Sequence, residues 1–112
     1  MSTPAVAVFS GRRQTMVAEL NFPTSRYNPR ALKVTWGAEH IVVTVTAKRT
    51  EQIIAYTSVR HADAWLEVLG TECLTYHLWL GGTLFELRLP EFKVLRDRLG
   101  PLGLRMRLGA LA

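Results

Sequence analysis

The chain has 112 residues, 48% of them hydrophobic and 21% charged, and its 14 Lys and Arg against 9 Asp and Glu give a net charge of +5. This composition predicts a single globular domain over residues 1–112, and it excludes a chain kept disordered by low hydrophobicity and high net charge. The longest uninterrupted apolar run, residues 5–9, is far shorter than the roughly 20 residues of a membrane-spanning helix, so we expect no membrane partner.

Two features of the sequence bear on location. Residues 1–10 lack the basic start and the longer apolar stretch of a secretory signal, and Cys73 is the single cysteine. Neither export nor a disulfide framework is indicated, and we expect a cytoplasmic protein.

The positive charge is concentrated at the two ends of the chain. Residues 1–30 carry four bases against one acid and residues 88–112 carry six against two, whereas residues 31–87 carry four against six. Most of the bases are arginine, whose planar guanidinium binds phosphate or carboxylate through paired hydrogen bonds and stacks on bases. This pattern favours nucleic acid or an acidic protein surface as partner, although the same net charge also suits a merely soluble domain.

The first part of the chain alternates apolar and polar residues, which predicts strands. Residues 5–9 and 15–22 form two strands around a turn at 10–13, and residues 23–29 form the longest loop. A second hairpin turns at Gly37-Ala38, because glycine suits a type II′ turn, and its register sets Val34 opposite Ile41. The predicted inward side chains are Met16, Ala18, Leu20, Phe22, Leu32, Val34, Ile41, Val43 and Val45.

Residues 50–70 fit either one long helix or a strand followed by a short helix. Residues 52–57 are rich in strand-favouring side chains, and Ser58 is a suitable N-cap. A helical stripe follows and ends at Gly70; its members are Ala62, Trp65, Leu66 and Leu69. We therefore expect a strand at 52–57 and a short helix at 60–69.

The strongest local pattern is a hairpin over residues 72–89, in which two alternating segments flank Gly81-Gly82. A two-residue turn there sets Leu80 opposite Thr83 and fixes every other pair. One face then carries Leu74, Tyr76, Leu78, Phe85, Leu87 and Leu89, and the other carries Cys73, Thr75, His77, Trp79, Leu84, Glu86 and Arg88.

The remaining residues predict a short helix and a final strand. Pro90 suits the first turn of a helix at 91–99, whose apolar side chains recur at Phe92, Leu95 and Leu99 before Gly100-Pro101 stops it. Residues 102–108 alternate with a period of two, which predicts a strand with Arg105 and Arg107 together on one side.

These elements predict an α+β fold: a largely antiparallel sheet of seven or eight short strands, curved or split into two layers, with two short helices. A lone C-terminal edge strand with an apolar side also indicates a possible homodimer through strand pairing.

The sequence indicates no metal site and no cofactor. Cys73 and His77 have a spacing that would suit zinc on a helix, but four residues along a strand span about 13 Å, too far for two ligands of one ion. Gly81-Gly82 lacks the spacing and the lysine of a phosphate-binding loop, so we interpret it as a turn.

The predicted outer face of the 72–89 hairpin carries the side chains that most need an explanation. His77 faces Glu86 there, with Arg88 on the same side, an arrangement that suits a general base but is more typical of a stabilising cross-strand pair. Trp79 lies beside Leu84, and we expect either a further layer over this face or a role for Trp79 as an anchor for a partner or an unpaired base.

The sequence thus predicts a small, basic, non-catalytic binding module that engages nucleic acid through its arginine-bearing ends. The candidate nucleic-acid-binding residues are Arg12, Arg13, Arg105 and Arg107, and the candidate partner or base contacts are Trp79, His77 and Arg88.

Three alternatives stay open at this point. The first is a protein-interaction module or inhibitor, of the kind carried by phages and mobile elements, that binds an acidic partner protein. The second is an antiparallel barrel around a small molecule, and the third is a small basic ribonuclease. No catalytic residue is assigned, because the three histidines form no recognisable constellation.

Overall fold

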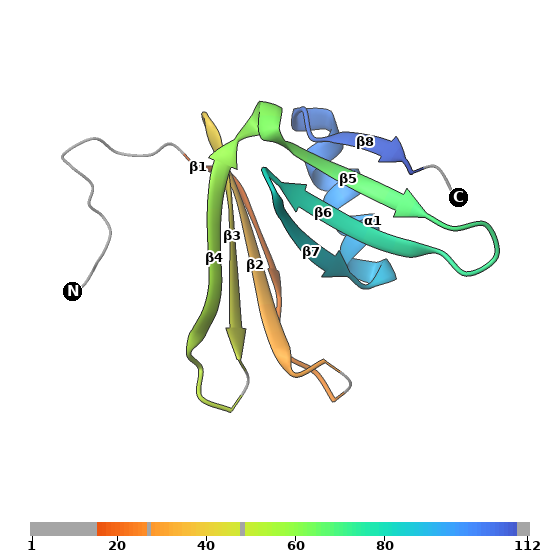
Figure 1. The fold of residues 1–112 in the computed structure, drawn as a ribbon. Helices are drawn as coiled ribbons and strands as arrows, with labels where there is room; N and C mark the ends of the chain where they lie inside the picture. The colour runs from red at the N-terminus through yellow and green to blue at the C-terminus, as the bar shows by residue number, and fades with distance from the viewer. Residues whose placement is uncertain (1–15, 27, 48, 110–112) are drawn as a thin grey trace.

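A computed structural model describes residues 16–26, 28–47 and 49–109. The predicted strand at 5–9, the turn at 10–13 and therefore Arg12 and Arg13 lie outside the described residues. Within them the chain forms eight strands in two four-stranded sheets, together with one α-helix (Figure 1).

The first sheet is an antiparallel meander in the order β1-β2-β3-β4. Its strands are β1 (Met16–Phe22), β2 (Arg30–Gly37), β3 (His40–Ala47) and β4 (Ile53–Arg60). The strands predicted at 15–22 and 52–57 are confirmed, and so is the inward face of the second hairpin, where Val34, Ile41 and Val43 are fully buried. Met16 is an exception, because it is 57% exposed at the start of β1.

The turn between β2 and β3 lies one residue later than predicted. Val34 pairs with Val43 rather than with Ile41, and Ile41 pairs with Trp36. The predicted register would have set Trp36 opposite Glu39, whereas the observed one places Trp36 and Ile41, 3% and 0% exposed, side by side in the core. The shift leaves the same residues on the inward face, so the alternation alone does not distinguish the two registers.

The second sheet has the order β7-β6-β5-β8. Its strands are β5 (Ala64–Leu69), β6 (Thr75–Leu80), β7 (Thr83–Leu87) and β8 (Arg105–Leu108). The hairpin at Gly81-Gly82 is confirmed pair by pair, from Leu80 with Thr83 to Tyr76 with Leu87. Of the C-terminal strand predicted at 102–108, only residues 105–108 form a strand, which lies at the sheet edge and runs parallel to β5, whereas Leu102 belongs to a 3-10 turn.

The helix predicted at residues 60–69 is wrong. The chain makes a single 3-10 turn, η1 (His61–Asp63), and then continues as β5, which pairs with β6 on one side and β8 on the other. Ala64 and Leu66, two residues apart on one face of β5, enter the core. A helix of ten residues has little stability of its own, and backbone pairing with two neighbouring strands outweighs it here.

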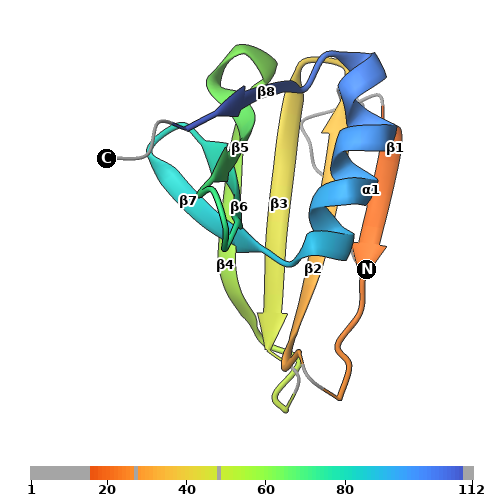
Figure 2. The same cartoon turned by 90° about the vertical axis from the view of Figure 1, so that its right-hand side faces the viewer.

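The helix predicted at residues 91–99 is confirmed as α1 (Leu89–Leu99). Pro90 lies in its first turn, and the Glu91 carboxylate accepts a hydrogen bond from the backbone N–H of Arg88 at 2.8 Å. A 3-10 turn, η2 (Gly100–Leu102), follows and leads into β8. α1 contacts strands of both sheets, β1 and β6, and Figure 2 shows it lying beside β1 and β2.

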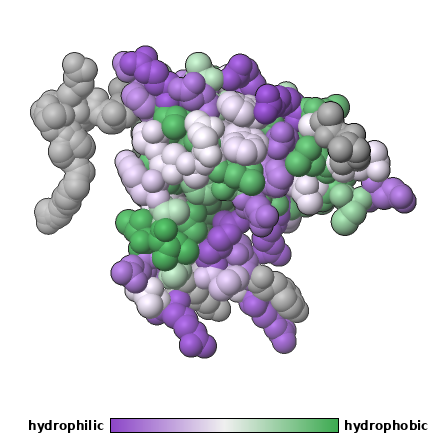
Figure 3. Space-filling view, viewed as in Figure 1, coloured by the Kyte–Doolittle hydropathy of each residue, from purple (hydrophilic) through white to green (hydrophobic). Residues whose placement is uncertain are grey.

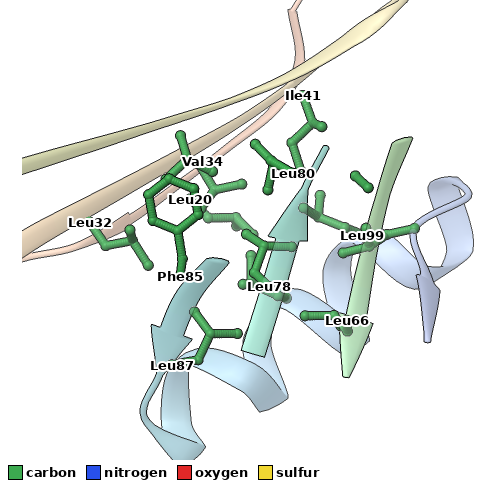
Figure 4. Packing of buried hydrophobic residues seen from close by; sticks show 14 of the residues in the cluster. Leu20, Leu32, Val34, Ile41, Leu66, Leu78, Leu80, Phe85, Leu87 and Leu99 are labelled. Carbon is green, nitrogen blue, oxygen red and sulfur yellow. The ribbon is translucent and has the colours of Figure 1, made fainter. Parts of the chain in front are cut away.

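The core fills the space between the two sheets and the helix. Figure 4 shows side chains of the first sheet, such as Val34 and Ile41, pointing toward Leu78 and Leu80 of the second, with Leu99 of α1 close by. The fold is therefore α+β and two-layered, as predicted. None of the helices in the described residues is long and apolar enough to cross a membrane.

Candidate functional site

The side of the second sheet that faces away from the core is called here the outer face. The strand register places two rows of side chains across it. The first row runs from β7 to β8 through Leu84, Trp79, Trp65 and Arg105, and the second through Glu86, His77, Glu67 and Arg107. The outer face thus joins an aromatic pair to two arginines at one edge of the sheet.

The aromatic pair is Trp65 on β5 and Trp79 on β6. Their rings stack with centroids 6.2 Å apart and an interplanar angle of 22°, and both side chains are half-buried. The Arg107 guanidinium lies over the Trp65 ring, 4.5 Å from its centroid, a cation–π contact. The Arg107 guanidinium and the two indole rings therefore form one stack on the outer face.

Neither of the two predicted helices forms a further layer over this face. α1 packs on the core side of the sheet, and the second predicted helix is β5 itself. Leu84 is 41% exposed in consequence.

Glu67 lies under this surface and connects its members. Its Oε1 accepts hydrogen bonds from Trp79 Nε1 at 2.8 Å and from His77 Nδ1 at 3.2 Å, while Oε2 lies 3.8 Å from Arg107 Nη2. The hydrogen bonds from Trp79 and His77 hold the pKa of Glu67 below its ordinary value, aided by the nearby positive charge and against the effect of burial. The site therefore contains a buried carboxylate that fixes the orientation of the Trp79 ring.

The two C-terminal arginines lie where the alternation predicted them, on one side of β8. Arg105 donates a hydrogen bond to the carbonyl of Ala62, which holds its side chain against η1. Trp65, Arg105, Met106 and Arg107 line a shallow, open hollow of about 370 Å³. Arg105 and Arg107 are both exposed, so an anion can reach this side of β8.

Comparisons with known proteins bear on the fold. No model of a known protein family matches the chain, and no curated protein matches it. A solved structure is similar. It is the hSac2 domain from human phosphoinositide phosphatase Sac2, with a TM-score of 0.52 and 8% sequence identity over 88% of this chain and 79% of that one. At this identity the likeness concerns the fold alone.

Of the other predicted contact residues, His77 belongs to the outer face and Arg88 lies at the start of α1. His77 faces Glu86 across the strands, as predicted, but its imidazole is hydrogen-bonded to Glu67 on the opposite neighbour strand. Arg88 is the N-cap residue of α1, and its backbone N–H is used there. Cys73 is exposed in the loop before β6, and no three His, Cys, Asp or Glu side chains of the described ranges come together as a metal site.

Trp65 and Glu67 were missed as site residues because residues 60–69 were interpreted as a helix. The signal that would have found them is the alternation from Ala64 to Leu69, in which Ala64 and Leu66 enter the core and Trp65 and Glu67 do not lie on that face. A strand there places Trp65 beside Trp79 and Glu67 beside His77.

Proposed function

We propose that this chain is a non-catalytic binding module that engages single-stranded nucleic acid on the outer face of its second sheet. The observation that carries the proposal is the stacked pair Trp65 and Trp79 beside Arg105 and Arg107. Arginine supplies the contacts to phosphate, and the part of the half-buried indole rings that stays accessible contacts unpaired bases. The net charge of +5 adds long-range attraction for a polyanion.

The spacing of the two arginines supports an extended strand as ligand. Arg105 and Arg107 are two residues apart on one side of a strand, so their side chains leave the backbone about 6.6 Å apart. Each guanidinium is therefore placed to take a separate phosphate of one strand. A duplex keeps its bases stacked inside and offers nothing to the indole rings, which favours the single-stranded form. Arg12 and Arg13 are part of the proposal on the sequence alone.

A protein partner is the second candidate. Ile53, Ile54 and Tyr56 on the edge strand β4 are 61%, 60% and 65% exposed, and Figure 3 shows an apolar patch on this edge of the first sheet. The edge strand β8 adds Leu108, which is 77% exposed, as a place where a second copy would pair. A cytoplasmic location is part of both proposals.

The direct test measures, by fluorescence anisotropy, the binding of labelled oligonucleotides to protein that was treated with nuclease during purification. We expect single-stranded DNA or RNA of 12 nucleotides to bind at 50 mM salt, more tightly than the matching duplex, and to be released as salt rises to 200 mM. Charge reversal at the site, R105E with R107E, is expected to abolish this binding.

The matched control is R49E with R98E, which makes the same change in net charge at two exposed arginines outside the outer face. An equal loss of oligonucleotide affinity in both double variants would show that only the net charge matters. That result would contradict a defined binding site. Shortening of the oligonucleotide during the assay would instead favour the ribonuclease alternative. Co-purification of a protein that survives nuclease and high salt would favour the second candidate.

A further inference from the structure

The charges on the outer face are arranged asymmetrically, and this bears on how a strand would lie there. Arg105 and Arg107 occupy the β8 edge, and Glu86 occupies β7 at the opposite edge. The two edges are three strand spacings apart, about 14 Å. The face therefore carries two exposed guanidinium groups along one edge and an exposed carboxylate along the other, where the nearby Arg30 guanidinium is paired with Glu91.

This asymmetry orients a polyanion that binds the face. Phosphates gain from the two guanidinium groups over β8 and are repelled over Glu86, so the sugar-phosphate backbone follows β8. The bases then extend across the face toward β7, those beside Arg105 over Trp65 and Trp79 toward Leu84 and those beside Arg107 over Glu67 and His77 toward Glu86. The edges of the bases, which carry their hydrogen-bonding groups, are the part that reaches Glu86.

Glu86 is available for such a contact. Its side chain is exposed and takes part in no hydrogen bond or ion pair within the described part of the chain, although its backbone carbonyl accepts a hydrogen bond from Arg30. It borders a hollow of about 300 Å³ that is also lined by Thr75, His77 and Leu89. An acceptor without a partner thus lies beside a space open to a ligand.

We propose that Glu86 makes the outer face selective for bases that carry an exocyclic amino group, so that cytosine is preferred to uracil. The proposal rests on the function proposed above and names the ligand more closely. An ionised carboxylate only accepts hydrogen bonds. The N4 amino group of cytosine donates to it, whereas the O4 oxygen of uracil at the same position presents lone pairs to a negative charge.

The test compares deoxycytidine and deoxyuridine decamers. Their bases differ only in the group on C4, amino or carbonyl, and in the proton on the neighbouring N3. The wild-type protein is expected to bind the deoxycytidine decamer about five-fold more tightly, in keeping with one partly exposed charge-assisted hydrogen bond. In E86Q the amide both donates and accepts, so the preference is expected to disappear. E86Q is expected to bind the deoxyuridine decamer at least as well as the wild type does, because a repelling charge is gone.

E39Q is the matched control, because Glu39 is an exposed carboxylate in the turn between β2 and β3 of the other sheet. It is expected to keep the five-fold preference. Equal affinity of the wild type for the two decamers, or a preference that survives in E86Q, would overturn the selectivity while leaving the binding function intact. Failure of both decamers to bind the wild type would overturn the binding function and this inference together.

Discussion

The Glu67 carboxylate on β5 accepts a hydrogen bond of 2.8 Å from the Trp79 indole on β6, beneath a face that also carries two arginines. Glu67 is 8% exposed, and a buried carboxylate is stable only where donors surround it. Its three neighbours, Trp79, His77 and Arg107, come from β6 and β8. The residue therefore joins three strands at the centre of the proposed binding face.

Removal of this carboxylate is expected to destabilise the fold. Glu67→Ala leaves the Trp79 and His77 donors without their acceptor, and we expect a loss of about 3 kcal/mol in the free energy of unfolding. Glu67→Gln keeps an acceptor oxygen and is expected to lose about 1 kcal/mol. Urea unfolding followed by circular dichroism measures both, with the exposed Glu39→Ala as a control expected to change little. A loss in Glu67→Ala no larger than in the control would contradict the network.

The same carboxylate predicts a dependence of stability on pH. The pKa of Glu67 in the folded protein lies below the ordinary value of 4.5. Folding therefore favours the ionised form, so the stabilisation is complete above about pH 4.5 and is lost as pH falls through the lowered pKa. The difference in unfolding free energy between the wild type and E67Q is expected to be larger at pH 7 than at pH 3. A difference that stays constant or grows toward pH 3 would contradict the assignment.

Arg107 is expected to matter more for binding than for folding. Its side chain is 59% exposed, so loss of its contacts with Trp65 and Glu67 in Arg107→Ala is expected to cost less than about 1 kcal/mol of stability. The same change removes one phosphate contact, which should reduce the salt dependence of binding to single strands by about 0.7 in log–log slope. Arg98→Ala, on the exposed side of α1, is the control for both measurements. If the salt dependence of binding in Arg107→Ala has the same slope as in the wild type, Arg107 does not contact the bound strand.

Two ion pairs, Arg30–Glu91 and Lys33–Glu19, are expected to differ in their effect on stability because they differ in burial. Arg30 Nη2 lies 3.1 Å from Glu91 Oε1, whose side chain is 5% exposed and also caps α1. Glu91→Ala is expected to cost about 3 kcal/mol, because a helix cap is lost and Arg30 loses its carboxylate partner, keeping only its hydrogen bond to the Glu86 carbonyl. Lys33 and Glu19 lie 3.8 Å apart on the surface, and Glu19→Ala is expected to cost less than about 1 kcal/mol. Thermal unfolding that ranks the two variants in the opposite order would contradict this account.

The sequence predicts those parts of the fold in which one local pattern has a single interpretation. The pairing around Gly81-Gly82 is correct at every position, since a two-residue glycine turn leaves one register, in which Tyr76 and Leu78 share a face with Phe85 and Leu87. α1 is correct because Pro90 and Gly100 mark both ends. The arginine pair on β8 follows from the alternation alone.

Elsewhere the decision depends on contacts far along the chain. Residues 64–69 fit a helical stripe and a strand equally well, and the strand prevails because β6 and β8 pair with it on both sides. Because a helix was predicted there, Trp65 and Glu67 were not recognised as neighbours of Trp79 and His77. The only cross-strand partner predicted for His77 was therefore Glu86. The parallel pairing of β8 with β5 depends on the path through α1, which no local pattern encodes.

The indole N–H signals of the three tryptophans, observed by nuclear magnetic resonance during titration with a deoxycytidine decamer, test the binding face most directly. Trp36 is 3% exposed and stacks on His61 in the interior, so it serves as an internal control. We expect the Trp65 and Trp79 signals to move together and to saturate, and the Trp36 signal to stay in place. Signals of Trp65 and Trp79 that do not move while the oligonucleotide binds would place its site elsewhere on the molecule and contradict the account.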